Sequence, residues 1–327
     1  MAEIIQHKDI VPESCLGKRL DQTIAEMFPD YSRSRLKDWI LAGHVAVNGN
    51  VITKAREKMF GGEAIVINAE IEAEVRFAPQ DLPLNIVYED DDVLVINKPA
   101  GFVVHPGAGN PDGTVLNALL HHCPQLDIVP RAGIVHRLDK DTTGLMVVAK
   151  TLQAQTQLVN QLQDRSMGRE YEAITMGVMT GGGIVEAPIA RHPTQRTKMA
   201  VSPEGMGKDA ITHYRVLKKF NAHTHIRCKL ETGRTHQIRV HMSHIGYPLV
   251  GDQTYFGRFR LPKGISLHLR QELQEFQRQA LHARELSLWH PTTDEYMTWD
   301  ADLPEDFQKL LQALSDEQSE TYEDVDF

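Results

Sequence analysis

Short apolar segments separated by glycine- and proline-bearing turns fill most of the chain between residues 86 and 290, and each is typical of a β-strand. They are 93–98, 133–138, 145–150, 170–178, 212–220, 224–232 and 281–290. Among them only residues 151–165 have apolar residues at helical spacing, with Leu152, Thr156, Val159 and Leu162 on one side. Because strands do not alternate with helices as in βαβ units, the pattern predicts an α+β domain built mainly on antiparallel sheet.

A smaller module precedes this region, between Leu16 and Ile67. Residues 17–28 read as a first helix. A second helix begins after Ser32, a suitable N-cap, and ends at Gly43, while Asn48-Gly49 is a strong signal for a hairpin turn. This order of helix, helix and hairpin resembles the S4-type RNA-binding domain. Arg33 and Lys37 share a face of the second helix, and the resemblance implies that they contact RNA; the alternative is a small cap on a larger enzyme.

Length and composition narrow the class of protein. A chain of 327 residues with 41% hydrophobic residues suggests about two globular domains. No run approaches the roughly 18 apolar residues of a spanning helix, and the first 14 residues lack the features of a signal peptide. Three cysteines, Cys15, Cys123 and Cys228, are an odd number and favour reduced thiols. We therefore expect a cytoplasmic protein with no membrane partner.

The net charge of −9 is unevenly distributed. Residues 301–327 hold nine acids and one base, and residues 64–92 hold eight acids and one base. Residues 93–300 instead carry 24 bases and 18 acids, a balance that suits contact with phosphates. The alternative explanation is that these surplus bases are only solvated surface.

These patterns predict five regions along the chain. Residues 1–15 form an N-terminal extension and residues 16–67 the S4-like domain. An acidic, proline-bearing linker follows at 68–85, and the main domain occupies 86–305. Residues 306–327 are acidic and poor in apolar residues, so we expect a flexible tail.

Two motifs that suggest a cofactor or a metal are weak. The glycines of residues 101–114 miss the G-x-G-x-x-G spacing of a dinucleotide loop, so this segment reads as a loop at the domain edge. His121-His122-Cys123 has no second ligand pair at metal-binding spacing nearby, and surface or packing residues are the better interpretation. We expect neither a cofactor site nor a metal site.

Charged residues cluster in a turn that lies between two apolar segments, at residues 133–150. Its polar members are His136, Arg137, Asp139, Lys140, Asp141, Thr142 and Thr143. Downstream come Tyr171 and the segment 231–242, which contains Arg234, His236, Gln237, Arg239 and His241. A charged turn between buried strands is a common way to present an active site on a rigid scaffold. Taken singly, Asp139 could be a turn residue, Tyr171 a core aromatic, and the segment of Arg239 a basic surface strand.

Together, the motifs HRLDKDTTGL at 136–145 and ETGRTHQIRVHM at 231–242 resemble the RluA-type family of RNA pseudouridine synthases. The resemblance extends from the S4-like module over most of the chain. It implies an isomerase that breaks the N1–C1′ bond of a uridine, turns the base and rejoins it through C5. Nothing is added or lost in this reaction, so the family resemblance implies no cofactor or metal, and one carboxylate is sufficient.

The resemblance also implies roles for individual residues. Asp139 is the catalytic carboxylate, acting on the sugar by attack at C1′ or by another route. Arg239 keeps that carboxylate ionised, and Tyr171 packs against the base and relays the C5 proton. Arg137 enters the RNA in place of the flipped base, whereas Arg234 and His236 contact phosphate or base. His136 reads rather as a structural hydrogen-bonding residue.

For the substrate, the resemblance implies 23S rRNA or a large ribosomal subunit precursor, at the loop of helix 69. Two alternatives stay open: a ribosome-assembly factor that only binds rRNA, and the same isomerisation on tRNA or another rRNA site. An S4-like domain on a linker favours a monomer that folds around its RNA.

Overall fold

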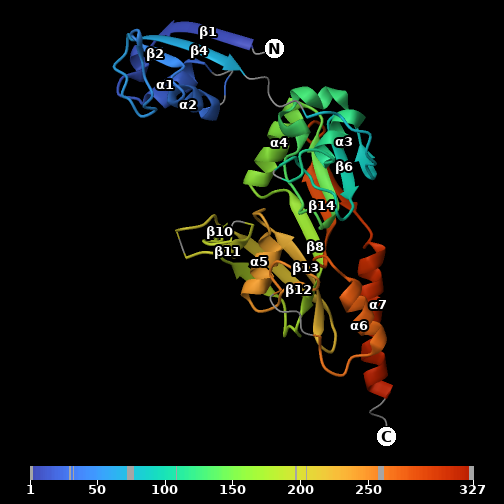
Figure 1. The fold of residues 1–327 in the computed structure, drawn as a ribbon. Helices are drawn as coiled ribbons and strands as arrows, with labels where there is room; N and C mark the ends of the chain where they lie inside the picture. The colour runs from blue at the N-terminus through green and yellow to red at the C-terminus, as the bar shows by residue number, and fades with distance from the viewer. Residues whose placement is uncertain are drawn as a thin grey trace. The chain divides into compact units, whose positions relative to one another are not determined.

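The computed structural model describes residues 3–28, 31, 33–71, 77–107, 109–195, 197–203, 205–256 and 261–323. The chain divides into two compact units, residues 1–76 and residues 77–327 (Figure 1). Each unit has a hydrophobic core of its own.

The first unit combines a four-stranded antiparallel sheet with two helices. Its elements are β1 (Glu3–Ile10), α1 (Leu20–Met27), α2 (Arg33–Leu41), β2 (Val45–Val47), β3 (Asn50–Val51) and β4 (Ala64–Ile71), and the strand order is β1-β4-β2-β3. The apolar faces of α1 and α2 bury Leu20, Ile24, Leu36 and Ile40. Asn48 and Gly49 both have positive φ, as a two-residue hairpin turn requires, so the predicted hairpin is confirmed. The predicted N-cap Ser32 lies outside the described residues.

Two predicted boundaries of this unit are wrong. The N-terminal extension is a strand, because β1 pairs with β4 over its whole length and Cys15 after it is buried. The linker is also shorter than predicted, because β4 runs to Ile71 while Phe77 and Leu84 pack against the core of the second unit. Both errors have one cause: the partners of these segments are distant in sequence.

The second unit is built on a nine-stranded sheet of mainly antiparallel strands, as the sequence predicted. Its strands are β5 (Ile86–Glu89), β6 (Val93–Lys98), β7 (Thr143–Ala149), β8 (Gly168–Met176), β9 (Gly183–Glu186), β12 (Ile211–Lys219), β13 (His223–Leu230), β14 (Leu281–Trp289) and β15 (Tyr296–Asp300). The order is β5-β6-β7-β14-β8-β13-β12-β9, with β15 on β14. A separate hairpin joins β10 (Ile189–Arg191) to β11 (Met199–Val201).

One pairing in this sheet is parallel, that of β7 with β14, and it is short. It joins Thr143 to His282 and Gly144 to Ala283. Gly144 has φ +113°, and a Cβ there would lie 2.2 Å from the carbonyl oxygen of Ala283. Glycine is therefore required where β7 begins, directly after the charged turn.

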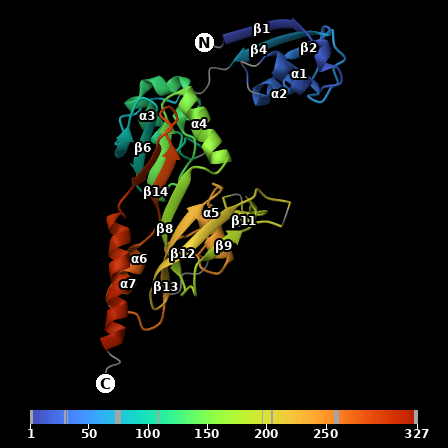
Figure 2. The same cartoon turned by 180° about the vertical axis from the view of Figure 1, so that it is seen from behind.

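Five helices accompany the sheet in the described part of the second unit: α3 (Val115–His122), α4 (Leu152–Gln163), α5 (Gln237–His244), α6 (Leu267–Glu275) and α7 (Glu305–Glu323). α3 and α5 contribute to the largest core together with side chains of β6, β7, β8 and β13. Figures 1 and 2 show α6 and α7 side by side along β8 and β13, on the side away from α5. Of these helices the sequence predicted only α4. For the segment of Arg239 it offered a basic surface strand as an alternative, whereas the structure has the helix α5 there.

The predicted flexible tail is wrong for most of its length, because residues 305–323 form α7. Phe307, Leu310, Ala313 and Leu314 are fully buried, at a spacing that aligns them on one helix face among the acids. Asp306 also pairs with Arg278 through two hydrogen bonds of 2.6 and 2.9 Å. Residues 324–327 lie outside the described chain.

Residues 133–138 are not a strand either. The short 3₁₀ segment η3 (Pro130–Gly133) has positive φ at Arg131 and Ala132, which turns the chain, and Ile134 makes only an isolated bridge to Val148. The charged residues that follow therefore lie in a loop that leads into β7. None of the described helices has the length and apolar character needed to cross a membrane.

Candidate active site

A cavity of about 1290 Å³ lies in the second unit. Its walls come from segments far apart in sequence: the turn before β7, the start of β8, and the loop that leads into α5. It brings together six of the residues selected from the sequence, which are Arg137, Asp139, Tyr171, Arg234, His236 and Arg239. Arg33 and Lys37 lie on α2 in the first unit, where both side chains are exposed.

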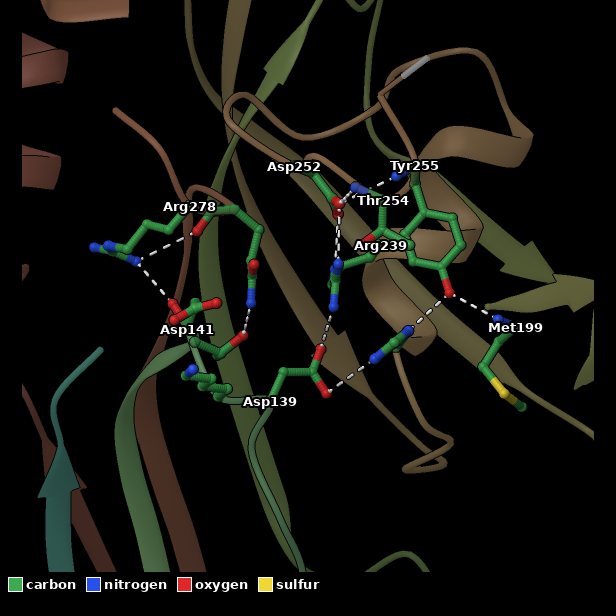
Figure 3. Close-up of polar contacts among 12 residues, drawn as sticks. Asp139, Asp141, Met199, Arg239, Asp252, Thr254, Tyr255 and Arg278 are labelled. Carbon is green, nitrogen blue, oxygen red and sulfur yellow. Dashed lines mark hydrogen bonds and ion pairs between the residues drawn. The ribbon is translucent and has the colours of Figure 1, made fainter. Parts of the chain in front are cut away.

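The turn that carries Asp139 is fixed by hydrogen bonds from several elements. The Thr142 N–H donates to the carbonyl oxygen of Asp139 at 3.1 Å. Arg278 donates to the carbonyl oxygen of Asp141 at 3.3 Å, as Figure 3 shows. The Thr143 hydroxyl pairs with His282 Nδ1 at 2.8 Å, on β14. The Asp139 backbone is thus held before any substrate arrives.

Lys98, at the end of β6, ties this turn to a second loop. It is 1% exposed, and its Nζ donates to the carbonyl oxygens of Pro99, Phe102 and Lys140 at 2.8, 3.0 and 2.8 Å. Burial lowers the pKa of Lys98 to about 8, against the attraction of Asp141 and Asp139. Lys98 was not among the site residues predicted from the sequence, although a lysine at the end of an apolar segment is an unusual position that could have indicated a structural role.

Asp139 and Arg239 meet across the cavity, 100 residues apart in sequence. Arg239 Nη1 donates to Asp139 Oδ2 at 2.9 Å. The same guanidinium binds Asp252 through Nε and Nη2, at 2.7 and 2.9 Å, in a bidentate pair (Figure 3). Burial alone lowers the pKa of Arg239, but its hydrogen bonds and attraction to Asp252 and Asp139 raise it above its ordinary value. Arg239 is therefore a fixed cation shared by two carboxylates.

Asp252, which holds Arg239 in place, is a second residue that was not predicted from the sequence. Its side chain is completely buried, and its Oδ1 also accepts the N–H groups of Thr254 and Tyr255 at 2.9 and 3.1 Å. The signal was a single acid in the segment LVGDQTY, since a carboxylate beside apolar residues needs a partner. Its partner could not be read from the sequence.

His236 faces the other oxygen of Asp139. Its Nε2 lies 3.8 Å from Asp139 Oδ1, and its Nδ1 lies 2.7 Å from the Tyr255 hydroxyl. That hydroxyl also accepts the Met199 N–H at 2.9 Å (Figure 3). Burial lowers the pKa of His236, so the ring is neutral at neutral pH. Because the Asp139 carboxylate faces Nε2, we assign the ring proton to Nε2, which leaves Nδ1 to accept the Tyr255 hydroxyl.

Tyr171 reaches the cavity from β8 and is 6% exposed. Burial raises its pKa, which Arg169 counteracts and Asp139 reinforces. The hydroxyl therefore keeps its proton at neutral pH. It has no hydrogen-bond partner among the described residues, so it is free to bind a substrate.

The other residues selected from the sequence differ in how far their side chains are buried and hydrogen-bonded. Arg137 is exposed and has no hydrogen bond or ion pair within the described part of the chain. Arg234 is half-buried, and its Nε donates to the carbonyl oxygen of Asp209 at 2.9 Å. His136 accepts the Val147 N–H at 3.1 Å, and burial lowers its pKa to about 3, with a further contribution from Arg169. His136 therefore stays neutral and makes a structural hydrogen bond to β7.

One group outside the cavity has metal-ligating residue types: Glu89, His122 and Cys123, whose ligand atoms lie within 4.8 Å of one another. Glu89 is already paired with Lys150 at 2.9 Å and with His122 at 2.8 Å. The ammonium of Lys150 thus stands where a cation would have to approach.

A carboxylate held by a buried arginine, beside an uncommitted tyrosine in a cavity of an antiparallel sheet, suits chemistry on a sugar–base bond. Comparison with known proteins identifies the class. Residues 92–244 match the family of RNA pseudouridylate synthases, and residues 18–59 match the S4 domain. The chain belongs to the RNA pseudouridine synthase family and is an isomerase.

Similar proteins include Ribosomal large subunit pseudouridine synthase D of Escherichia coli K12, which is 60% identical over 327 residues, covering 100% of both chains. The protein of that name from Yersinia pestis is 61% identical over the same span. Among solved structures, Human RNA Pseudouridylate Synthase Domain Containing 4 has a TM-score of 0.55 and 28% identity, covering 71% of this chain and 93% of that chain. The resemblance to this family seen in the sequence is confirmed.

Proposed function

We propose that this pseudouridine synthase isomerises uridines of 23S rRNA in the loop of helix 69, on the large ribosomal subunit or its precursor. The support for a large-subunit substrate is the similarity of 60% or more, over the full length, to proteins named for that subunit. The S4 domain supports an RNA partner, since Arg33 and Lys37 project from one exposed face of its second helix.

The observation that carries the mechanism is the pairing of Asp139 with Arg239. One carboxylate oxygen accepts a hydrogen bond from a guanidinium that Asp252 already fixes, so the Asp139 carboxylate faces a permanent cation inside the cavity. The other oxygen has no hydrogen bond among the described residues, and His236 Nε2 lies 3.8 Å from it. That oxygen is the one that acts on C1′ of the flipped uridine.

The other residues selected from the sequence bind the target nucleotide and the RNA around it. Tyr171 packs against the uracil, and its hydroxyl can accept the C5 proton as its own proton leaves to solvent, from which N1 takes up one proton. Arg137, exposed two residues before Asp139, fills the space that the flipped base leaves in the RNA. Arg234 and His236 contact the phosphate or the base at the cavity wall.

Pseudouridine mapping across total RNA tests this proposal in cells that lack the protein. The cells are rescued with wild type, with Asp139→Asn, or with Asp127→Asn, which makes the same chemical change at an exposed site outside the cavity. We expect the helix 69 marks to vanish and to return with wild type and Asp127→Asn only. Marks restored by Asp139→Asn contradict the catalytic role of Asp139.

The same experiment separates the two alternatives. If every pseudouridine persists without the protein, the chain acts as an assembly factor that binds rRNA. If the marks that vanish lie in tRNA or elsewhere in rRNA, the chemistry stands and the helix 69 target is wrong.

A further inference from the structure

Arg169 is a buried cation with no counter-ion among the residues that the structure describes. It lies on β8 two residues before Tyr171, so both side chains project from the same face of the strand, and both line the cavity. Arg169 is 5% exposed. Within the described residues its guanidinium makes one long hydrogen bond, from Nη2 to the carbonyl oxygen of Glu231 at 3.4 Å, and its buried Nε has no partner.

The acids near Arg169 are committed elsewhere. The carboxylate of Glu231 binds Arg165 at 2.7 Å and His213 at 2.6 Å. The carboxylate of Glu172, three residues along β8, binds His225 at 2.7 Å and Arg227 at 2.6 Å. The groups that face Arg169 from other elements are His136, which is neutral, and Arg234, which is itself a cation.

The loop before α5 leaves room for the guanidinium. A Cβ on Gly233 would lie 2.6 Å from Arg169 Nη1, so the absence of a side chain there lets Arg169 occupy its position. Burying an unpaired charge is costly unless a ligand supplies the missing partner. Here an open cavity adjoins the charge, and Tyr171, the tyrosine proposed to pack on the base, is its neighbour on the strand.

We propose that Arg169 forms an anion subsite that binds a negatively charged oxygen of the flipped uridine nucleotide. Two oxygens have this chemistry. One belongs to the phosphate beside the target uridine. The other is a uracil carbonyl oxygen, which gains charge when the C1′–N1 bond breaks and its electron pair goes to the base. The base then bonds through C5, loses the C5 proton and takes one up at N1. This inference rests on the proposed role of the Asp139 cavity.

The first test measures the single-turnover rate of pseudouridine formation and the melting temperature in Arg169→Met. We expect the rate to fall about 100-fold, as when one preorganised anion-binding donor is removed. We expect the melting temperature to stay equal or rise, because the variant removes an unpaired buried charge. Arg215→Met is the matched control, since Arg215 is exposed on β12 outside the cavity, and its rate should stay within about twofold. A lower melting temperature with an unchanged rate means a structural role and overturns the proposal.

Two further variants separate charge from position. Arg169→Lys keeps the charge but not the planar fork, and should retain part of the rate. Gly233→Ala keeps Arg169 itself but pushes against its Nη1, and should lower the rate without altering the net charge. A Gly233→Ala enzyme with the full wild-type rate argues against a requirement for the observed guanidinium position.

The two oxygens are distinguished with RNA that carries a neutral methylphosphonate at the target phosphate. If Arg169 binds the phosphate, the single-turnover rate of wild type should be lower on this RNA than on unmodified RNA. The rate of Arg169→Met should then be the same on both RNAs. If the uracil oxygen is bound, the loss in Arg169→Met is the same on both RNAs and lies in the rate, not in RNA affinity. Equal rates of wild type and Arg169→Met on unmodified RNA exclude both. A wild type inactive on helix 69 RNA signals failure of the proposed target instead, and the comparison then uses the RNA that cellular mapping identifies.

Discussion

At the scale of single residues, the cavity is organised around one guanidinium that serves two carboxylates. Asp252 holds Arg239 with two hydrogen bonds and also accepts two backbone N–H groups, whereas the Asp139 carboxylate receives one hydrogen bond from the described residues. This asymmetry gives the two acids different roles. In the proposed mechanism, Asp252 positions the arginine and Asp139 keeps an oxygen free for the substrate.

Replacing Asp252 with asparagine should therefore damage catalysis without touching the substrate. The variant keeps the shape of the side chain but removes its charge, so Arg239 loses its fixed orientation. We expect kcat to fall about 10- to 100-fold, in line with the effect of small misplacements of a catalytic group. RNA affinity, measured by filter binding, should change little. A kcat equal to that of wild type would show that Asp252 is not needed to position Arg239 for catalysis.

Tyr255→Phe tests the assignment of the ring proton of His236. Without the hydroxyl, nothing donates to Nδ1, and the imidazole is free to move its proton from Nε2 to Nδ1. We expect the ¹⁵N shifts of the His236 ring to change toward the other tautomer, and kcat to fall about 10-fold. Tyr296→Phe is the matched control, because it removes a tyrosine hydroxyl that lies outside the cavity, where it donates to Ser287. Unchanged ring shifts in Tyr255→Phe contradict the assignment.

The lowered pKa of Lys98 predicts that the unfolding free energy depends on pH. Its folded-state pKa of about 8 lies below the ordinary value of 10.5, so the unfolded chain binds more protons between these values. The contribution of Lys98 to the unfolding free energy therefore rises with pH in this window, by about 2 kcal/mol between pH 7 and pH 9.5. Lys98→Met lacks this rise, so its deficit against wild type should widen over the same interval. Urea unfolding at the two pH values measures the difference, and a constant deficit refutes the prediction.

At the scale of secondary-structure elements, α7 shows how burial outweighs composition. The helix is acidic, yet Phe307 is completely buried against α6 and β8. Phe307→Ala should lower the unfolding free energy of the second unit by about 3–5 kcal/mol, the usual cost for a buried phenylalanine. Lys309→Ala, exposed on the same helix, should cost less than about 0.5 kcal/mol. Comparable losses in both variants would mean that α7 adds nothing by packing.

Sequence patterns predicted the elements whose signal is local. The period and length of the apolar segments located β6 and β7 to within two residues, and the capped, periodic α4 was equally clear. Elements that depend on a distant partner were missed. β1 is recognisable only through its pairing with β4, and α5 is too short and polar to show an apolar face until the core surrounds it. The same reason applies to Asp252, whose role exists only beside Arg239.

At the scale of the whole molecule, the proposed function gives the first unit affinity for RNA and the second unit the chemistry. Each has its own core, so a chain that begins at residue 77 should fold and keep the cavity. Removal of the first unit should weaken RNA binding and flatten its dependence on salt, because the lost phosphate contacts release fewer counter-ions. Affinity measured from about 50 to 200 mM salt tests this, with Asp139→Asn to block turnover in both chains. A salt slope identical to that of the full-length chain rules out phosphate contacts by the first unit.

The position of β14 in the sheet determines when the cavity can form during synthesis of the chain. β14 lies between β7 and β8, although it follows β8 by more than 100 residues in the chain. The turn of Asp139 and the strand of Tyr171 therefore cannot come together while the polypeptide is still short. Such late closure of non-local pairings slows folding and exposes open strand edges. A ribosome that makes this enzyme must release the chain beyond β14 before the product can act on RNA, so a stalled product that ends before β14 should be inactive.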